Sequence, residues 1–353
     1  MNVFQLRHHL ISEYNEYISS FINIKDDKIR DFVETEIEQG LLWPNPLIQL
    51  NPSYKEGASI DELVDEGHLN EGCRNIFRIR KDEHDYGQPL RLFKHQEEAI
   101  RIYASGADNY VLTTGTGSGK SLAYIIPVVD HILKTGPGKG IQAIFVYPMN
   151  ALANSQMGEL EKFLKEGSTV TFERYTGQEN DEEKRQIRMN PPDILLTNYV
   201  MLELILTRPE ERQTIIQGTE NLAFLVLDEL HTYRGRQGSD VAMLVRRLRN
   251  SIGSQKLRCI GTSATLATEG ELSEQRQEIA SVATKLFGDE VKPEHIIGET
   301  LTRISPEFDL SNMEFFDSLS NRILGSDNQI PQTHAAYIKD PLVRWLESMI
   351  GVE

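Results

Sequence analysis

Nine residues near position 115 have the composition of a phosphate-binding loop. They read Thr113-Thr114-Gly115-Thr116-Gly117-Ser118-Gly119-Lys120-Ser121 and stand between an apolar run at 110–112 and an apolar-periodic run at 122–133. Glycines let the backbone turn tightly, so that successive N–H groups and a helix N-terminus can face one anion. Lys120 would reach the β- and γ-phosphates of a nucleotide, and the Ser121 hydroxyl would bind Mg²⁺. The flanking strand and helix disfavour the alternative, a solvated glycine-rich turn with an incidental lysine.

Two carboxylates and a histidine follow another apolar run, at 222–227. Ligands of open α/β sheets bind at the carboxyl ends of the strands, which is where Asp228, Glu229 and His231 are expected. Asp228 is placed to hold Mg²⁺ opposite Ser121, directly or through water. Glu229 could orient or deprotonate the water that attacks a γ-phosphate. Adjacent acids in an exposed loop are the alternative, and the phosphate loop earlier in the chain makes it the weaker one.

Alternating strands and helices must position these groups. Apolar runs predict strands at 110–114, 141–147, 169–174, 193–197, 222–227 and 257–263. Helices are expected between them, including 93–105, 120–134 and a charged, solvated helix at 179–190. This alternation predicts an α/β fold, in which a doubly wound parallel sheet carries helices on both faces.

The segments outside this pattern are expected to be accessory. Amphipathic helices are predicted at 4–22 and from 26 or 27 to 40, followed by an extended arm anchored by Trp43. Ser59 and Glu62 have the spacing of a capping box, which predicts a short helix ending near Gly67. We therefore expect an accessory region at 1–89, a nucleotide-binding domain at 90–298, and an irregular extension at 299–353.

Composition limits the class of protein. The 353-residue chain is 39% hydrophobic and 25% charged, which is ordinary for a globular protein, and it is long enough for two domains. Cys73 and Cys259 lie far apart and outside any metal-ligand spacing, so we expect no disulfide framework, no structural zinc site, and a reducing cytoplasm. Neither a signal peptide nor a membrane span is expected.

The net charge of −16 is unevenly distributed. Residues 1–89 contain 9 basic and 17 acidic side chains, and residues 269–353 contain 7 and 16. The middle, 90–268, contains 21 and 20 and is therefore close to neutral. Because the acidic excess belongs to the flanks, the total charge does not exclude a polyanionic ligand bound by the middle.

Three segments together resemble the motifs of superfamily 2 DExH-box helicases. They are the phosphate loop, Asp228-Glu229-Leu230-His231 and Thr262-Ser263-Ala264-Thr265, in the order found in the first of that family's two RecA-like domains. The resemblance implies a RecA-like fold that binds ATP and Mg²⁺. The catalytic positions that it implies are Lys120, Asp228, Glu229 and His231, with Ser121 and Asp228 holding the metal. The implied nucleotide-binding positions are Gln96, Thr114, Gly115, Thr116, Gly117, Ser118, Gly119, Lys120 and Ser121.

The resemblance also implies contacts to a nucleic acid. The segments at 147–156 and 195–199 look like motifs that track one strand of DNA through backbone groups and short side chains. Taken alone, each of these side chains would more often be a cap or a turn former. The same resemblance assigns His231, Ser263 and Thr265 to coupling between the ATP site and the strand. The strand-contacting positions that it implies are Asn150, Gln156, Thr197 and Asn198.

Longer features narrow the resemblance to one branch of the family. The segment 228–235, with Gly238 and the arginines at 246, 247 and 249, is similar to the bacterial mitomycin-repair and Lhr-like helicases. The arm from Trp43 and the stretch 296–300 look like those of very large bacterial helicases, including anti-phage defence proteins such as Druantia. Thr114 and Leu230 depart from the commoner small residues at their positions. No second RecA-like domain follows Thr265, so we expect a longer protein whose second domain completes the ATP site.

Two functions remain open at this level. The first is the N-terminal motor domain of an ATP-dependent DNA helicase or translocase in repair or defence, poorly active without its second domain. The second is a binding module in which ATP acts only as a switch and the acidic flanks dock partner proteins. Strand displacement during ATP turnover distinguishes them.

Overall fold

The computed structural model divides into two compact units. It describes residues 2–21, 24–40, 53–79, 86–106, 109–115, 117–165, 168–212, 219–252, 257–264, 271–306, 312–325 and 331–351. One unit spans Ser53–Thr302, and the other groups residues 1–52 with residues 303–353. Residues 53–89, which the sequence analysis placed in an accessory region, therefore belong by their contacts to the larger unit.

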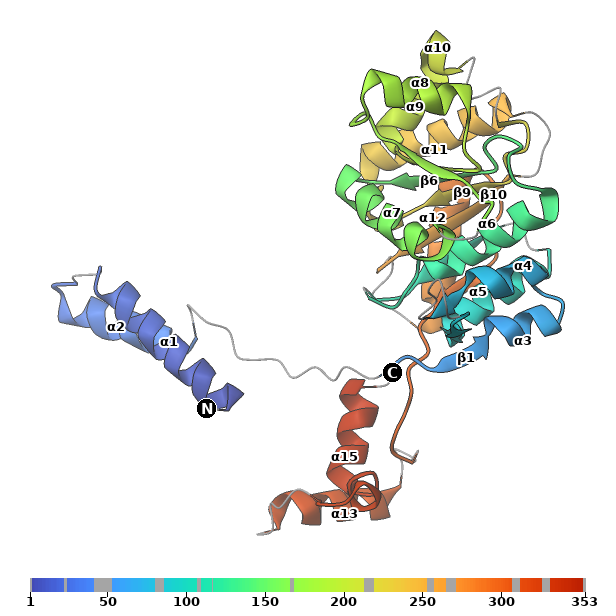
Figure 1. Cartoon of the computed structure of the whole chain (residues 1–353). Coiled ribbons are helices and arrows are strands. Elements are labelled where there is room, and N and C mark those ends of the chain that lie inside the picture. The colour runs from blue at the N-terminus through green and yellow to red at the C-terminus, as the bar shows by residue number, and fades with distance from the viewer. Residues whose placement is uncertain are drawn as a thin grey trace. The chain divides into compact units, whose positions relative to one another are not determined.

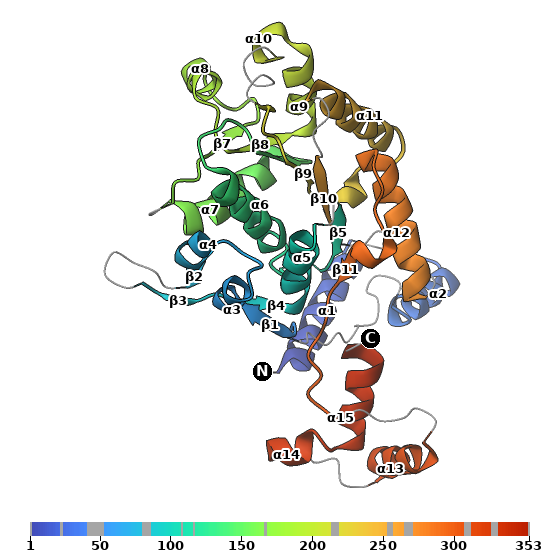
Figure 2. The same cartoon turned by 90° about the vertical axis from the view of Figure 1, so that its right-hand side faces the viewer.

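A seven-stranded parallel sheet lies at the centre of the larger unit (Figure 1, Figure 2). Its strands follow the order β11-β5-β10-β9-β6-β8-β7, and all six pairings are parallel. The six expected strands are confirmed to within a few residues, whereas β11 was not predicted because its apolar run is too short to stand out. The strands are β5 Tyr110–Thr113, β6 Ala143–Tyr147, β7 Phe172–Tyr175, β8 Ile194–Asn198, β9 Phe224–Leu227, β10 Arg258–Ser263 and β11 Ile296–Gly298.

Apolar residues cover both faces of this sheet. Successive strand residues point to opposite sides, so Leu112 and Phe145 join one core cluster while Val111 and Ile144 join the other. The first cluster includes side chains of α3 Ile60–Asp65, α4 Glu71–Ile76, α5 Lys94–Ala104, α6 Leu122–Thr135 and α7 Asn150–Leu164. The second includes side chains of α8 Asp181–Met189, α9 Tyr199–Thr207, α11 Gly235–Ser251 and α12 Leu272–Phe287. The expected doubly wound arrangement is thereby confirmed.

Local signals define several of these helices. Ser59 and Glu62 form the expected capping box of α3, and the charged helix α8 begins at a second box made by Asn180 and Glu183.

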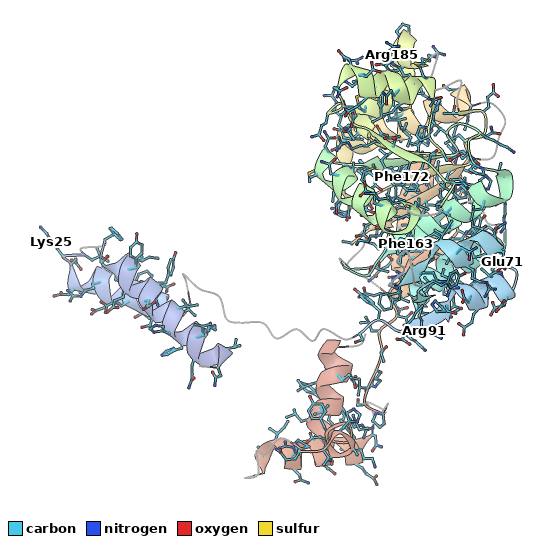
Figure 3. All side chains as sticks on the ribbon, in the orientation of Figure 1. Lys25, Glu71, Arg91, Phe163, Phe172 and Arg185 are labelled. Atoms are coloured by element: carbon cyan, nitrogen blue, oxygen red, sulfur yellow. The ribbon has the colours of Figure 1, made fainter. Side chains whose placement is uncertain are left out.

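Phe163 of α7 packs partly buried on the first core cluster, as does Phe172 of β7 (Figure 3). The shorter elements are α10 Pro209–Glu211, the 3₁₀ turns Leu230–Thr232 and Pro293–His295, the antiparallel pair β1 Glu56–Ser59 with β4 Arg91–Phe93, and the antiparallel pair β2 Arg78–Ile79 with β3 Gln88–Pro89.

The described residues of the smaller unit are mostly helical. The two amphipathic helices expected near the N-terminus are α1 Val3–Ser19 and α2 Asp27–Glu38, whereas the predicted arm from Trp43 lies outside the described residues. The extension after 302 was expected to be irregular but contains α13 Met313–Leu324, α14 His334–Tyr337 and α15 Pro341–Leu346. Each of these three helices begins at a polar side-chain cap. None of the described helices is long and apolar enough to cross a membrane.

A buried carboxylate joins the helices on the first face. Asp130 of α6 is fully buried and accepts hydrogen bonds from the Asn70 amide at the start of α4 (2.5 Å) and the Tyr103 hydroxyl of α5 (2.6 Å). The ammonium of Lys134 lies 2.7 Å away. Burial, and then the charge of Asp130, raise the pKa of Tyr103 well above its usual range, so the phenol stays a donor.

Replacing Asp130 by alanine is expected to lower the free energy of unfolding by about 3 kcal/mol, because it leaves buried donors on two helices without an acceptor. Chemical denaturation of both proteins measures the difference. Asp240→Ala, on the exposed side of α11, is the matched control and is expected to change stability by less than about 0.5 kcal/mol. Equal losses in the two variants would contradict the account of the network.

Candidate functional site

The predicted chemical groups meet at the carboxyl edge of three neighbouring strands. β10 lies between β5 and β9 in the sheet. The phosphate loop follows β5, Asp228 and Glu229 follow β9, and β10 ends at Ser263. Segments more than 100 residues apart in the chain are therefore brought together by strand order.

The phosphate loop has the backbone that its glycines permit. Gly117 and Gly119 have φ angles of 81° and 72°, which side-chain-bearing residues rarely adopt. A Cβ on Gly119 would also lie 2.7 Å from the Gln96 amide nitrogen. The loop is closed internally by a 2.6 Å contact between the hydroxyls of Thr114 and Ser118, both fully buried. Thr114 thus supports the loop from within, which explains why a hydroxyl is accommodated at that position.

Lys120 and Ser121 begin the helix that follows the loop. The Lys120 ammonium donates to the Thr114 carbonyl (3.2 Å) and lies 3.9 Å from Oε1 of Glu229. Ser121 precedes the first residue of α6 and its side chain makes no cap to that helix. The lysine therefore spans the space between the loop and the acid pair, and the serine stands at the helix start. Thr116, also predicted as a nucleotide-binding residue, lies outside the described residues.

Two residues of α5 support the loop from the side. The Gln96 amide donates to the Gly119 carbonyl (2.8 Å), and its carbonyl accepts from the Phe93 amide (2.8 Å). His95 Nε2 lies 2.9 Å from the Ser118 carbonyl, with the ring fully buried. Burial lowers the pKa of His95, so the ring is neutral near pH 7 and donates through Nε2. The prediction did not include His95, although its position next to Gln96 was the available signal.

The acid pair combines a buried and a strained residue. Asp228 is 9% exposed, and burial raises the pKa of its carboxyl, with Glu229 adding to the effect. Glu229 has φ 53° and ψ 56°, a left-handed conformation that costs a non-glycine residue about 1 kcal/mol. Its Oε2 atom lies 3.2 Å from Nδ1 of His231 without the geometry of a hydrogen bond and is otherwise unpartnered. A buried carboxylate oxygen beside the loop lysine thus accepts no hydrogen bond.

Thr262 joins the two acids, a role that was not predicted for it although it begins the Thr262–Thr265 motif. Its hydroxyl donates to Oδ1 of Asp228 and accepts from the Glu229 amide (3.1 Å). The parallel register that places Gly261 beside Leu227 puts Thr262 next to Asp228. Ser263, which was predicted, contacts Nδ1 of His231 at 3.2 Å. Thr265 lies outside the described residues.

Leu230 occupies a pocket that exists because residue 261 is glycine. Leu230 is 1% exposed, as expected for a side chain beneath the loop. A Cβ on Gly261 would lie 2.4 Å from Cδ1 of Leu230 and 3.1 Å from Phe287. The Leu230 side chain therefore fits because Gly261 of β10 has no side chain.

Gly261→Ala is expected to lower the free energy of unfolding by about 1 to 3 kcal/mol through overpacking. The double variant with Leu230→Ala is expected to lose less stability than the sum of the two single losses, because the smaller side chain at 230 removes the closer of the two contacts. Denaturation of the two single variants and the double variant gives the coupling energy between them. Strictly additive losses would show that the two positions are not in steric conflict.

The predicted strand-contacting residues lie at the ends of β6 and β8, but two of them are turned inward. Thr197 is fully buried and its hydroxyl donates to the Tyr175 carbonyl (2.7 Å). The Asn198 side chain caps α9 through Met201 and donates to Oδ1 of Asn150 (2.7 Å). Asn150 itself is half-buried at the first position of α7.

Gln156 and the arginines of α11 also have partners within the unit. Gln156 accepts a hydrogen bond from the Tyr124 hydroxyl (3.3 Å). Arg246 donates to carbonyls of Ala242 and Lys285, and Arg247 pairs with Glu203 at 3.2 Å. Arg249 likewise donates to Phe287 and Cys259. The guanidinium groups of these three arginines therefore join α11 to neighbouring elements of the same unit.

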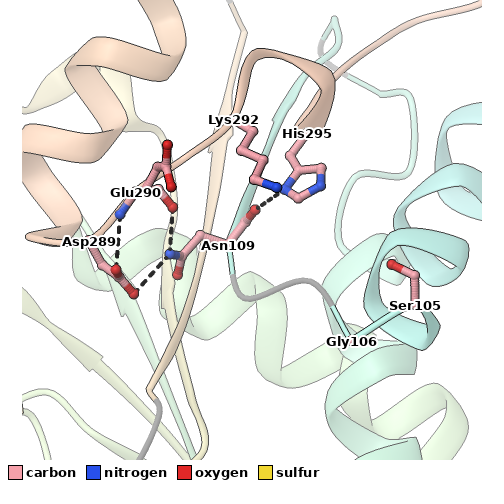
Figure 4. Close-up of a pocket in the computed structure, with 7 residues that line it drawn as sticks. All are labelled: Ser105, Gly106, Asn109, Asp289, Glu290, Lys292 and His295. Carbon is pink, nitrogen blue, oxygen red and sulfur yellow. Dashed lines mark hydrogen bonds between the residues drawn. The ribbon is translucent and has the colours of Figure 1, made fainter.

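The sheet also has a polar cavity at its opposite edge. A cavity of about 380 Å³ is lined by Ser105, Gly106, Asn109, Asp289, Glu290, Lys292 and His295 (Figure 4). Asn109 immediately precedes β5 and its side chain donates to Asp289 (3.2 Å) and to the Glu290 carbonyl (2.9 Å). Because it lies at the amino end of β5, this cavity is separate from the phosphate loop at the carboxyl end.

Comparison with known proteins matches the segment that contains these motifs. The sequence profile of the DEAD/DEAH box helicase family matches residues 93–272. The Druantia protein DruE of Escherichia coli (strain UMEA 4076-1) is 26% identical over 73% of this chain and 20% of its own length. The uncharacterized ATP-dependent helicase YprA of Bacillus subtilis (strain 168) is 35% identical over 52% of this chain and 24% of its own. The chain therefore spans about a quarter or less of these curated relatives.

A solved structure has the same fold. The DUF1998 helicase MrfA bound to DNA matches 87% of this chain and 40% of its own, with a TM-score of 0.55 and 22% sequence identity. This likeness supports the RecA-like arrangement of the sheet, as expected from the motifs. The family profile covers about half of the chain and includes the phosphate loop, the acid pair and the end of β10. The chain belongs to the DEAD/DEAH box helicase family.

Proposed function

We propose that this chain is the first motor domain of a longer ATP-dependent DNA helicase or translocase. The observation that carries the proposal is the convergence of Lys120, Asp228 and Glu229 at one sheet edge, with 3.9 Å between the ammonium of Lys120 and the carboxylate of Glu229. Two carboxylates and one ammonium surround a loop whose backbone is shaped for an anion. Mg-ATP has the charge pattern that such a site accommodates.

The residues fit magnesium and a triphosphate. Ser121 and Asp228 offer hard oxygen ligands of the kind that Mg²⁺ prefers, and Thr262 fixes the orientation of Asp228. Bound Mg²⁺ would neutralise part of the negative charge on the phosphates. Lys120 would exchange its bond with the Thr114 carbonyl for one with a phosphate oxygen. Glu229, with an unpartnered Oε2 atom, would accept a hydrogen bond from a water molecule and orient it for attack on the γ-phosphate.

Contact with a nucleic-acid strand is proposed for the ends of β6 and β8. Asn150 and the backbone N–H groups around it would hold phosphates, a contact that carries no sequence information. Thr197 and Asn198 would act as positioning residues, because their side chains join β7, β8 and α7. His231, between Glu229 and Ser263, is proposed to couple the ATP site to this edge. The MrfA structure, which contains DNA, supports DNA as the first ligand to test.

The full-length protein is expected to act in repair or anti-phage defence in the cytoplasm, with a second RecA-like domain and partner proteins. The alternative, an ATP-switched binding module, is supported by the acidic flanks, which contain 17 acidic and 9 basic side chains in residues 1–89 and 16 and 7 in residues 269–353. In this alternative, the acidic flanks would bind a partner protein and the chain would not move along DNA.

Two assays on the full-length protein test the proposal. ATP hydrolysis is expected to rise when single-stranded DNA is added, and a partly duplex substrate is expected to be unwound only while ATP is turned over. A rate of ATP hydrolysis that does not change when nucleic acid is added would contradict the proposal. A partner affinity that changes with ATP while nothing is unwound would establish the alternative.

A further inference from the structure

The larger unit begins and ends in one antiparallel strand pair. An isolated antiparallel β-bridge between Tyr54 and Leu301 joins residues 53–55 to residues 300–302, and we call these two segments the terminal strand pair. Two backbone hydrogen bonds of 2.8 and 2.7 Å join them, donated by the amides of Lys55 and Thr302. Because the unit spans Ser53–Thr302, the chain connections to both flanks leave from this pair.

The residue just before the second strand of this pair contacts the phosphate loop. β11 runs parallel to β5 with Gly298 beside Thr113, so both strands end at the same level. Glu299 follows β11, and its Oε2 atom accepts a hydrogen bond of 2.9 Å from the Gly115 amide. A side-chain carboxylate thus occupies a backbone donor of the loop that is expected to bind phosphate.

Tyr54, in the first segment of the pair, lies beside the phosphate loop. A Cβ on Gly115 would lie 3.4 Å from the Glu299 carboxylate and 3.5 Å from the Tyr54 hydroxyl. The Tyr54 ring packs edge-on against His95 with ring centres 5.6 Å apart, and His95 contacts the Ser118 carbonyl. Tyr54 therefore lies beside the start of the loop and packs on His95, which contacts the loop near its end.

Charge decides what nucleotide binding does to these contacts. The triphosphate is a polyanion, and a carboxylate fixed at the rim of its binding loop repels it. Glu299 is exposed to solvent, so water and salt weaken this repulsion without abolishing it. If the carboxylate instead bound the ribose hydroxyls, it would strengthen nucleotide binding. Removing its charge would then lower the affinity for nucleotide, whereas removing a repelling charge would raise it.

We propose that Glu299 is an intramolecular anion that competes with nucleotide at the phosphate loop, and that its release on nucleotide binding loosens the terminal strand pair. Occupancy of the ATP site would in this way reach the two points at which the flanks join the unit. The inference rests on the proposed nucleotide site. It assigns to Glu299 and Tyr54 a part in regulation that the ATP chemistry itself does not require.

The first test measures affinity for Mg-ATP by calorimetry with wild-type protein, Glu299→Gln and the control Glu294→Gln. The Glu299→Gln substitution keeps an acceptor for the Gly115 amide but removes the charge, while Glu294 is an exposed acid in the 3₁₀ turn that precedes β11. Glu299→Gln is expected to bind about 2- to 5-fold more tightly, with the gain shrinking at high salt, and Glu294→Gln is expected to match the wild type. Equal or weaker binding by Glu299→Gln would overturn the inference. No binding by the wild type would instead reject the proposed nucleotide site.

The second test follows hydrogen exchange of the Lys55 and Thr302 amides with and without saturating nucleotide. In the wild type, nucleotide is expected to speed exchange at both positions, because the Glu299 anchor is lost. In Glu299→Gln the nucleotide effect is expected to be smaller, since the neutral side chain is not repelled from the Gly115 amide. Unchanged or slower exchange in nucleotide-bound wild type would show that the loop and the strand pair are not coupled in this way.

Discussion

Lys120→Ala is expected to reduce ATP hydrolysis by the full-length protein at least about 100-fold. The ammonium lies between the Thr114 carbonyl and the Glu229 carboxylate, and no other Lys or Arg side chain pairs with this acid pair among the described residues. Without it, the charge of the β- and γ-phosphates at the loop is no longer balanced by a protein cation. Both affinity for the nucleotide and the rate of turnover should therefore fall.

Lys162→Ala is the matched control for this substitution. Lys162 is an exposed residue of α7, paired with Glu159 at 2.5 Å, and does not contact the loop. Its hydrolysis rate is expected to equal that of the wild type. Hydrolysis by Lys120→Ala at the wild-type rate would mean that the phosphate loop is not the site of ATP turnover.

Glu229→Gln is expected to separate binding from turnover. The substitution keeps the size of the side chain and its place beside His231 but removes its capacity to accept a proton. We expect hydrolysis to fall about 100- to 1000-fold while affinity for Mg-ATP changes little, because loop contacts to the phosphates remain. Removal of a negative charge from the site is expected to add little affinity, since Lys120 loses its partner at the same time.

The decisive comparison is between binding and turnover measured on the same preparation of the variant. Glu278→Gln, an exposed position on α12, controls for the loss of one acidic side chain. A parallel loss of binding and turnover in Glu229→Gln would assign Glu229 to holding the nucleotide or the loop. If Glu229→Gln hydrolysed ATP at the wild-type rate, Glu229 would have no part in the hydrolysis step.

The central part of the fold was predictable because its signals are local. Near-continuous apolar runs such as 141–147 predict buried parallel strands, and the capping box at Ser59 predicts where α3 begins. The phosphate loop combines three glycines with a lysine and a serine, a pattern that few other structures require. Strand β11 was missed because its three residues are too short to show a period.

The parts of the site that could not be predicted depend on strand order. Thr262 contacts Asp228 because β10 pairs with β9, and Glu299 contacts Gly115 because β11 pairs with β5. A sequence does not state which strands are neighbours. The resemblance implies that Thr197 contacts nucleic acid, and the structure adds that its buried hydroxyl donates to the Tyr175 carbonyl, a bond that the sequence alone does not predict.

The most direct test of the nucleotide site is a crystal structure of this chain with Mg²⁺ and a non-hydrolysable ATP analogue. The account predicts phosphates against the backbone N–H groups of the loop, the γ-phosphate within hydrogen-bond reach of Lys120, and Mg²⁺ beside Ser121 and Asp228. A nucleotide bound elsewhere, for example in the cavity beside Asn109 and His295, with an empty phosphate loop, would contradict it.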